Sequence, residues 1–448
     1  MRIPSPLHWP VFVAGLGTIV VPLDAAVNVA FPDITRAFGL SIPRIQWVVI
    51  VYMLAQTSLM LVFGRLGDMI GHRRVFLAGS AWSVLAFLAC AMAPSYPWLL
   101  AGRVAQGIGA GLLLSCGPAL AIAGQGEAMR ARLLGIYTML YSLGFAIGPI
   151  VAGFLVAGFG WSAVFWFRAP LALLAVVASL SLEPAPAPMV RQRFDVAGAG
   201  LLIAAMSAAV LFVDRLQHLA ESLIWPVLAL LAAGVCFFAF CRQERRTAQP
   251  IIDVRVFAIP GFARLTLAAA LVNLACFAVL LLVPFYLARV AGLPVRLAGL
   301  ALACSAIGMT LASPVAGLLA TRAGPYALAR SGCLAMAVGL GGIAAAPGLA
   351  LLLAALFLQG MGQGIFQVAI FDLVTATLPP EARGVAGSLG MLTRTVGVVV
   401  GASVLILAFQ TLLRTTGGAF TPAFQGLFAL AAAIPAFCIL ALARPARG

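Results

Sequence analysis

The sequence predicts an all-α membrane protein whose fourteen spanning helices form two related blocks of six, with two additional helices between them. Three observations support this fold class. The composition is too apolar for a soluble protein, apolar runs of spanning length follow one another along the chain, and a set of glycine, glutamine and arginine positions recurs at one constant spacing.

Composition decides the broad class. Of 448 residues, 63% are hydrophobic and 9% are charged, and the mean hydropathy is +1.12. A soluble domain is about 45–50% apolar and about 25% charged, so this chain lacks the polar residues needed to cover a water-exposed surface. We therefore expect one helical bundle in a lipid bilayer instead of several soluble domains.

The positive charge fits a membrane protein better than a nucleic-acid-binding protein. The formal net charge is +15, but the basic residues, all of them arginine, stand singly or in small groups between apolar runs. Loop charges beside a membrane have this pattern, so no nucleic acid is expected as a partner. The eight cysteines lie mostly inside apolar runs without CxxC spacing, which indicates packing. No cleaved signal peptide is expected.

A polar linker divides the apolar runs into six and eight. The segment Glu183–Asp195 (EPAPAPMVRQRFD) is too polar to cross a membrane and too rich in proline for a helix. Before it, spans are expected near residues 10–31, 44–63, 75–93, 97–123, 132–157 and 161–182. After it, spans are expected near residues 196–213, 222–241, 264–287, 296–320, 326–347, 349–374, 384–411 and 422–443. The run at 349–374 could be broken at its own glycines.

The expected division of the chain follows from this count. It comprises an N-terminal six-helix half at 1–190, a two-helix insertion with cytoplasmic linkers at 191–262, and a C-terminal six-helix half at 263–448. When the N-terminus is placed inside, most arginines fall on the cytoplasmic side, which predicts that both termini are cytoplasmic. The use of arginine without lysine indicates a GC-rich bacterial genome, so the bacterial inner membrane is the expected location.

The loop between the second and third spans has a recognisable pattern. It is GRLGDMIGHRR, in which Gly64 and Gly71 permit a tight turn, Asp68 can meet a helix N-terminus or an arginine, and Arg73 faces the cytoplasm. It resembles the signature loop of the major facilitator superfamily, G-x-L-x-D-x-x-G-R/K-R/K, with His72 as the one departure. The resemblance implies a loop that stabilises one of two conformations. An ordinary charged loop is the alternative.

The two six-helix blocks share residues 253 positions apart. The recurring positions are Gly64 with Gly317, Gly71 with Gly324, Gln106 with Gln359, Gly107 with Gly360, Arg130 with Arg383, Gly144 with Gly397 and Gly148 with Gly401. Blocks with equal numbers of helices have the same orientation, so these are parallel repeats, as in major facilitator transporters. The resemblance implies a substrate path between the halves, with the two helices near 196–241 at the periphery.

The fourth span begins LAGRVAQGIGAG and contains one arginine. A buried arginine costs roughly 2.5 to 3.5 kcal/mol on insertion scales, so Arg103 must be paired or lie near water. The segment resembles the second motif of the family, which suggests that Arg103 is a polar partner close to the proton pathway. Snorkelling of Arg103 to the interface is the alternative. A phosphate-binding loop is excluded, because no strand precedes the glycines and the chain has no lysine.

The fifth span contains YSLGFAIGPIVAGF. Its residues Gly144, Gly148 and Gly153, together with Pro149, give a helix face without side chains and a local backbone break. The segment resembles the antiporter motif of family members that export their substrates, which favours outward transport. General helix packing would explain the same glycines.

The first span carries a carboxylate inside an apolar run, VPLDAAVNVAFPDI. Asn28 follows Asp24 by four residues and is expected on the same helical face. Burial disfavours a charged carboxyl group, so Asp24 is expected to exchange a proton near neutral pH. The segment resembles the L-D-x-T-x-x-N-V-A-L-P of fourteen-helix drug:proton antiporters, although Ala26 replaces the threonine and the Asp-to-Asn spacing is one residue shorter. A structural Asp24 that caps a helix or pairs with Arg103 is the alternative.

These features predict a proton-coupled exporter of drugs or other small amphiphilic molecules that works by alternating access as a monomer in the bilayer. Asp24, Asn28 and Arg103 are the expected coupling and substrate residues, and no nucleotide, metal or organic cofactor is implied. A metabolite uniporter or importer of the same fold is the alternative. An intramembrane enzyme is disfavoured because the histidines, His8, His72 and His218, all lie in loops or at span ends.

Overall fold

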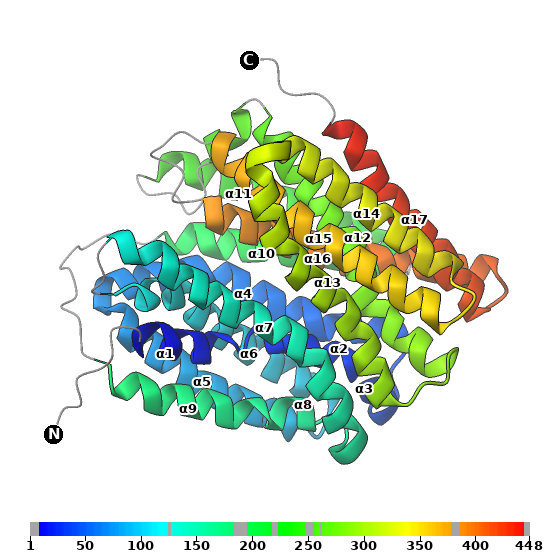
Figure 1. Ribbon diagram of the computed structural model, residues 1–448, viewed down its shortest axis with the longest axis horizontal. Helices are drawn as coiled ribbons and strands as arrows, with labels where there is room; N and C mark the ends of the chain where they lie inside the picture. The colour runs from blue at the N-terminus through cyan, green and yellow to red at the C-terminus, as the bar shows by residue number, and fades with distance from the viewer. Residues whose placement is uncertain are drawn as a thin grey trace. The chain divides into compact units, whose positions relative to one another are not determined.

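The computed structural model describes residues 9–123, 127–182, 195–216, 223–247, 254–259, 261–377 and 386–442. Over these residues the chain is helical and contains no strand (Figure 1). It divides into two compact units, Met1–Ala199 and Gly200–Gly448. The expected boundary at residue 190 lies outside the described residues.

The first unit contains ten helical elements. They are α1 (Trp9–Thr18), η1 (Pro22–Asp24), α2 (Ala25–Val29), α3 (Phe31–Ala37), α4 (Ile42–Ile70), α5 (His72–Ala91), α6 (Tyr96–Ala121), α7 (Glu127–Phe159), α8 (Ala163–Trp166) and α9 (Arg168–Leu180). Helix α6 packs against α1, α4 and α5, while α7 packs against α1, η1 and α2, and α5 packs against α9. The elements of the first span are thus enclosed by α6, α7 and α9.

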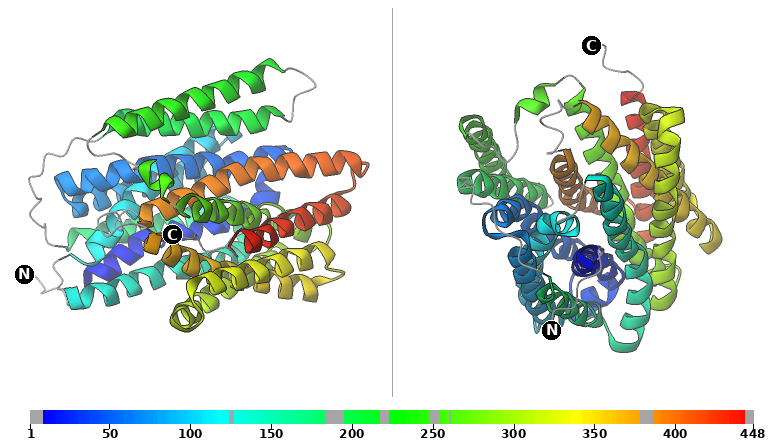
Figure 2. Two further views of the ribbon diagram at one scale, coloured as in Figure 1. Left: turned by 90° about the horizontal axis from the view of Figure 1, so that it is seen from above. Right: turned by 60° about the vertical axis from the view of Figure 1, so that its left-hand side comes forward.

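The second unit begins within α10 and continues to the C-terminus. Its elements are α10 (Val196–Leu216), α11 (Ile224–Arg246), η2 (Val254–Ala258), α12 (Phe262–Arg289), α13 (Val295–Ala323), α14 (Pro325–Ala345), α15 (Leu349–Thr377), α16 (Ala386–Thr415) and α17 (Phe420–Ala441). Helix α15 packs against α13 and α14, and α12 packs against α16 and α17. Helices α10 and α11 lie side by side in both views of Figure 2. Asp195 begins α10 by accepting a hydrogen bond from the Gly198 amide at 2.9 Å, a typical N-cap contact.

The number of membrane spans is close to the prediction but does not reach it. Within the described residues, twelve helices are long and apolar enough to cross a membrane, or thirteen if the bent pair α3 and α4 forms one span. The remaining candidate is α10, of which a shorter apolar part, Ala197–Ala209, was identified. The chain is therefore an all-helical multi-pass membrane protein. The run at 349–374 is one continuous helix, α15, in spite of its glycines.

The helices of the two units keep the spacing of the sequence repeat. Helices α4, α5 and α6 begin at residues 42, 72 and 96, while α13, α14 and α15 begin at 295, 325 and 349. Each pair differs by 253 residues, the same spacing that relates the recurring glycines and glutamines. The repeat therefore extends from single residues to the order and length of whole helices.

The first predicted span is not a continuous helix, which corrects the sequence-based expectation. Helix α1 ends at Thr18, and the chain continues through a turn and the short η1 and α2 before α3 begins. Pro22 explains the break, because its ring excludes the carbonyl of the residue four positions earlier, which is Thr18. Pro32, in the first turn of α3, marks the second interruption. Asp24 thus lies at the end of η1, in irregular backbone that is buried inside the unit.

Candidate functional site

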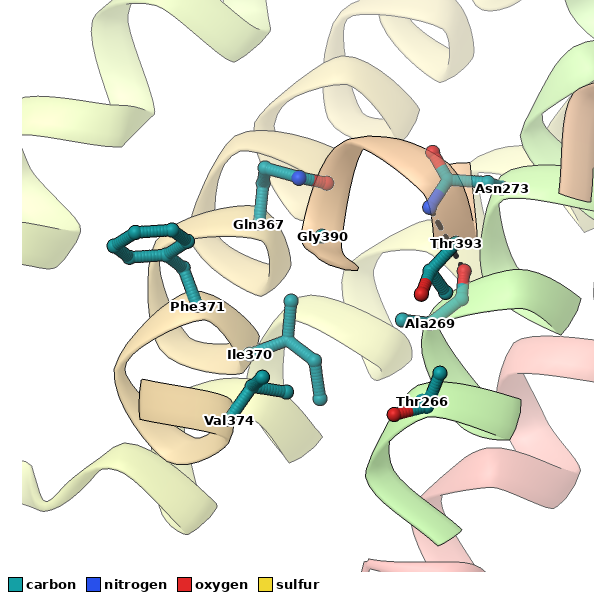
Figure 3. A pocket seen from close by; sticks show the side chains of 9 residues that line it. All are labelled: Thr266, Ala269, Asn273, Gln367, Ile370, Phe371, Val374, Gly390 and Thr393. Atoms are coloured by element: carbon teal, nitrogen blue, oxygen red, sulfur yellow. Dashed lines mark hydrogen bonds between the residues drawn. The ribbon is translucent and has the colours of Figure 1, made fainter. Parts of the chain in front are cut away.

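The second unit contains a small polar cavity. About 30 Å³ is enclosed by α12, α15 and α16, with Thr266, Asn273, Gln367 and Thr393 as its polar lining residues (Figure 3). The Asn273 amide donates to the Ala269 carbonyl at 2.8 Å. The volume suits about one water molecule, and no charged side chain lines it. This cavity is too small for an organic substrate.

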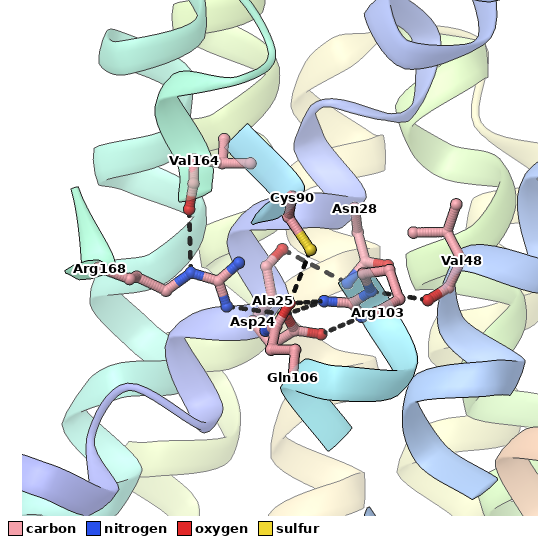
Figure 4. Close-up of polar contacts among 9 residues, drawn as sticks. All are labelled: Asp24, Ala25, Asn28, Val48, Cys90, Arg103, Gln106, Val164 and Arg168. Atoms are coloured by element: carbon pink, nitrogen blue, oxygen red, sulfur yellow. Dashed lines mark hydrogen bonds and ion pairs between the residues drawn. The ribbon is translucent and has the colours of Figure 1, made fainter. Parts of the chain in front are cut away.

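The first unit contains a charged cluster around Asp24 (Figure 4). The Nη1 and Nη2 atoms of Arg103 donate to Oδ1 and Oδ2 of Asp24 at 2.6 and 2.7 Å, a bidentate ion pair. Oδ1 also accepts from Arg168 Nη1 at 2.8 Å and from Gln106 Nε2 at 2.8 Å. Asp24 therefore joins the broken first span to α6 and α9.

Arg103 is held from several directions. Its Nε donates to the Val48 carbonyl of α4 at 2.8 Å, its Nη1 donates to Gln106 Oε1 at 2.7 Å, and its guanidinium lies 4.3 Å from the Tyr52 ring centroid. The glycines after Arg103 let α6 pack closely against α4, because a Cβ on Gly107 would meet the Tyr52 carbonyl oxygen at 2.5 Å. Arg103 is 0% exposed, which excludes the snorkelling alternative.

Arg168 is the residue that the sequence analysis missed. It is the first residue of α9 and is 0% exposed. Its Nε donates to the Val164 carbonyl at 2.9 Å, and its guanidinium lies 4.7 and 5.3 Å from the Phe87 and Phe165 ring centroids. Its Nη2 is buried without a hydrogen-bond partner. The position of Arg168, seven residues into the predicted sixth span, was a usable signal, because an arginine there cannot reach water easily.

The cluster carries a net positive charge. One carboxylate and two guanidinium groups give it a net charge of +1. Asn28 is buried, but its amide donates only weakly to the Ala25 carbonyl, at 3.4 Å. Gln106, and not Asn28, supplies the amide that donates to the Asp24 carboxylate. The Asp24 side chain is 14% exposed and both arginines are 0%, so the carboxylate is the one exposed member of the ion pairs.

Arg73 of the signature motif, in the first turn of α5, contacts the end of α9. Arg73 donates from Nε to the Ser179 carbonyl and from Nη2 to the Leu180 carbonyl, both at 3.0 Å. These are among the last carbonyls of α9, and the Ser179 carbonyl also accepts from the Leu182 amide at 3.3 Å. Gly71 has φ +97°, a conformation that other residues rarely adopt. Asp68 approaches His72 Nε2 at 3.5 Å and remains 57% exposed.

The glycines of the predicted antiporter motif lie against the break in the first span. A Cβ on Gly144 would meet Pro22 Cγ at 2.6 Å, and one on Gly148 would lie 3.5 Å from Leu23 Cα. Pro149 is inside the continuous helix α7. Gly153 is buried on the same helix. Two motifs that are far apart in the sequence therefore meet at the backbone that carries Asp24.

The cluster has no features of a metal or cofactor site. Asp24 provides one carboxylate, already bound by two arginines, and no group of three His, Cys, Asp or Glu side chains gathers anywhere in the described ranges. Arginine and glutamine around an acid are suited to exchanging a proton or an ion-pair partner. Buried ionisable residues inside a multi-pass helical bundle mark a candidate functional site.

The family of the chain is established by sequence comparison. The chain belongs to the Major Facilitator Superfamily, whose family model matches residues 12–402, with a second match at 265–447. It is 31% identical over 395 residues to the multidrug resistance protein Stp of Mycobacterium tuberculosis, covering 87% of this chain and 74% of that protein. It is 30% identical over 409 residues to the tetracenomycin C resistance and export protein of Streptomyces glaucescens, covering 89% and 75%.

A solved structure shows the same fold. The chain superposes on the crystal structure of the nucleoside transporter NupG (D323A mutant) with a TM-score of 0.69, covering 97% of this chain and 100% of that one. The sequence identity is 15%, so this likeness concerns the fold alone. The chain is thus a major facilitator transporter that moves a small molecule across a membrane.

Proposed function

We propose that this transporter exports drugs or other small amphiphilic molecules from the bacterial cell in exchange for protons, by alternating access, and that Asp24 carries the coupling proton. The observation that carries the proposal is the bidentate pair between Asp24 and Arg103, extended by Arg168, in an otherwise apolar bundle. The printed names of the two relatives, a multidrug resistance protein and an export protein, support the class of substrate and the direction.

The arrangement suggests how a proton would act. With the carboxylate bound by two guanidinium groups, the cluster is complete and the first span is tied to α6 and α9. Protonation of Asp24 removes the negative charge, which leaves two arginines facing a neutral acid and weakens both ion pairs. The ties between the three elements then loosen, and the conformation changes. The partial exposure of Asp24 gives the proton a route to its oxygens.

The backbone around Asp24 favours such a change. The first span is already broken at Pro22, so a shift of η1 requires no intact helix to be disrupted. The smooth face of α7 at Gly144 and Gly148 gives this segment a surface along which to move. The motif of Gly64 and Asp68 at the end of α4, Gly71 at the junction and Arg73 at the start of α5 has a separate role in stabilising one conformation from the cytoplasmic side. Asp68→Asn is then expected to slow turnover and leave substrate affinity nearly intact.

The test uses purified protein in proteoliposomes that are supplied with an amphiphilic fluorescent dye such as rhodamine 6G. Asp24→Asn should abolish dye accumulation driven by a pH gradient, while dye exchange without a gradient should persist, because a permanently neutral site can still change conformation. Asp33→Asn is the matched control: it makes the same chemical change in the same segment, at a carboxylate paired with the exposed Arg36. Accumulation by Asp24→Asn at the wild-type level would overturn the assignment.

The same experiment separates export from the alternative functions. A uniporter would equilibrate its substrate without any dependence on the pH gradient, and an importer would accumulate it in the opposite direction. Either result in the wild-type protein would refute proton-coupled export, whatever the outcome with the Asp24 variant.

We also propose fourteen spans, with both termini cytoplasmic, in the bacterial inner membrane. The two parallel repeats account for twelve spans, and α10 with α11 accounts for two more, arranged as a monomer in the lipid. Reporter fusions after Arg74, Arg191, Arg246 and Gly448 should score cytoplasmic, and fusions near Arg215 and Arg289 should score external. A reversed result between residues 191 and 289 would reduce the count to twelve.

A further inference from the structure

A second, larger cavity lies within the second unit, away from the charged cluster. It has a volume of about 650 Å³ and separates α10 and α11 on one side from α12 and α16 on the other. Its walls are almost entirely apolar, with Met206 and Phe237 facing Leu267 and Val400. Phe237 and Leu267 are nonetheless 58% and 60% exposed, so the cavity is a groove open to the surroundings of the helices. We refer to it as the lateral groove.

The helix pair is attached to the unit mainly at one end of this groove. Leu202 of α10 and Phe240 of α11 join a buried cluster with Val256, Phe262 and Leu265. Along the rest of α11 few residues are buried, although α11 is one of the apolar helices long enough to span a membrane. A gap between apolar surfaces forfeits dispersion contacts, so a bilayer-embedded groove of this size is stabilised by an apolar occupant.

The attached end of the groove carries several arginines, with one acidic residue, Glu244, buried among them. Arg245, in the last turn of α11, is the one charged residue among those that line the groove, and no acidic side chain pairs with it within the described part of the chain. Arg242 and Arg246 are exposed beside it. In the first turn of α12, the Nε and Nη2 atoms of Arg264 are buried without a hydrogen-bond partner. Such clusters of arginine at the end of a membrane helix attract anionic lipid headgroups.

We propose that the lateral groove binds one acyl chain of an anionic phospholipid, with its phosphate held by Arg245. An acyl chain would lie along the apolar walls of the groove, and the phosphate would pair with Arg245 at its end. An anionic phospholipid therefore matches both features of the groove. The bound lipid would fill the space between the helix pair and α12 with α16. Thr266 and Thr393, which form part of the groove wall, also line the small polar cavity (Figure 3), so the lipid would lie one side chain away from it.

The test is photo-crosslinking with phosphatidylglycerol that carries a diazirine in its acyl chain, followed by peptide mapping of the full-length protein in vesicles. Labelling should concentrate on α10, α11, α12 and α16, and unlabelled phosphatidylglycerol should compete better than phosphatidylcholine. Arg245→Gln should weaken binding roughly fivefold, whereas Arg242→Gln, a neighbouring exposed arginine that does not line the groove, should not. Labelling spread evenly over exposed helices would overturn the proposal.

A second pair of variants tests the apolar part independently of charge. Ala233→Phe places a ring inside the groove and should remove the labelling, while Ala232→Phe, on the exposed side of the same helix, should leave it intact. Equal labelling of these two variants would contradict the proposal. Displacement of the lipid by rhodamine 6G at concentrations that saturate transport would also contradict it, because the groove would then be an entry route for substrate.

Discussion

The ion pairs of Asp24 predict a large loss of stability when its charge is removed. In Asp24→Asn, the net charge of the cluster rises from +1 to +2, and the amide group turns donors toward guanidinium groups that are themselves donors. Removing one partner of a buried ion pair typically costs about 3–5 kcal/mol. With two arginines left uncompensated, we expect a loss of this size in the free energy of unfolding of the first unit.

A double variant that restores the net charge tests whether the uncompensated arginines cause this loss of stability. Asp24→Asn with Arg168→Gln restores the net charge of +1 and removes the buried Nη2 atom that has no partner. Directly interacting residues show coupling energies of about 0.5–3 kcal/mol, so the double variant should recover about 1–3 kcal/mol relative to the single one. The control Asp33→Asn should change stability by no more than about 0.5 kcal/mol, because its ion pair is exposed.

Denaturant unfolding in detergent, followed by tryptophan fluorescence, measures these differences. Asp24→Asn with the stability of the wild type would refute the reasoning, since a carboxylate with four hydrogen bonds to enclosed side chains cannot be removed without cost. A double variant that is less stable than the sum of its single changes predicts would show that the uncompensated charge is not the cause of the loss.

Three further variants test the surrounding structure. Arg103→Lys should reduce coupled transport several-fold, because lysine lacks the planar fork that makes the bidentate pair, and full transport would contradict this. Gly144→Ala should impair transport by forcing α7 away from the broken span, whereas Gly135→Ala, where a Cβ meets nothing within 4 Å, should transport normally. Arg73→Gln should lower stability by about 1–3 kcal/mol through loss of two capping bonds, and the exposed Arg74→Gln should not, as thermal unfolding in detergent would report.

Much of the fold could be predicted from sequence because lipid imposes simple rules. Apolar length defines spanning helices, and the glycines of the repeat gave the register that the helix starts of α4, α5 and α6 share with α13, α14 and α15. The break of the first span was harder to anticipate. Pro22 signals that α1 must stop, but the path of the chain through η1 and α2 depends on the packing against α7, which no local pattern encodes.

The candidate site was only partly predictable. Asp24 and Arg103 stood out because charges are rare in apolar runs, and the structure pairs them. Arg168 was overlooked although it lies seven residues into the predicted sixth span, and only the fold shows that its fully enclosed side chain pairs with Asp24. Asn28 was chosen for its helical spacing from Asp24, and α2 keeps that spacing, but the Asn28 amide donates to the Ala25 carbonyl instead of to the carboxylate.

The most direct test of the central claim is proton movement linked to substrate movement. Weakly buffered proteoliposomes with an internal pH dye are given rhodamine 6G without an imposed pH gradient, and dye flux and proton flux are recorded together. In both the wild type and Asp33→Asn, we predict that dye and protons move in opposite directions. In the charge-balanced Asp24→Asn, Arg168→Gln variant, we predict dye flux without proton flux. Proton flux that persists in the double variant would contradict the account, because the coupling proton would then bind elsewhere.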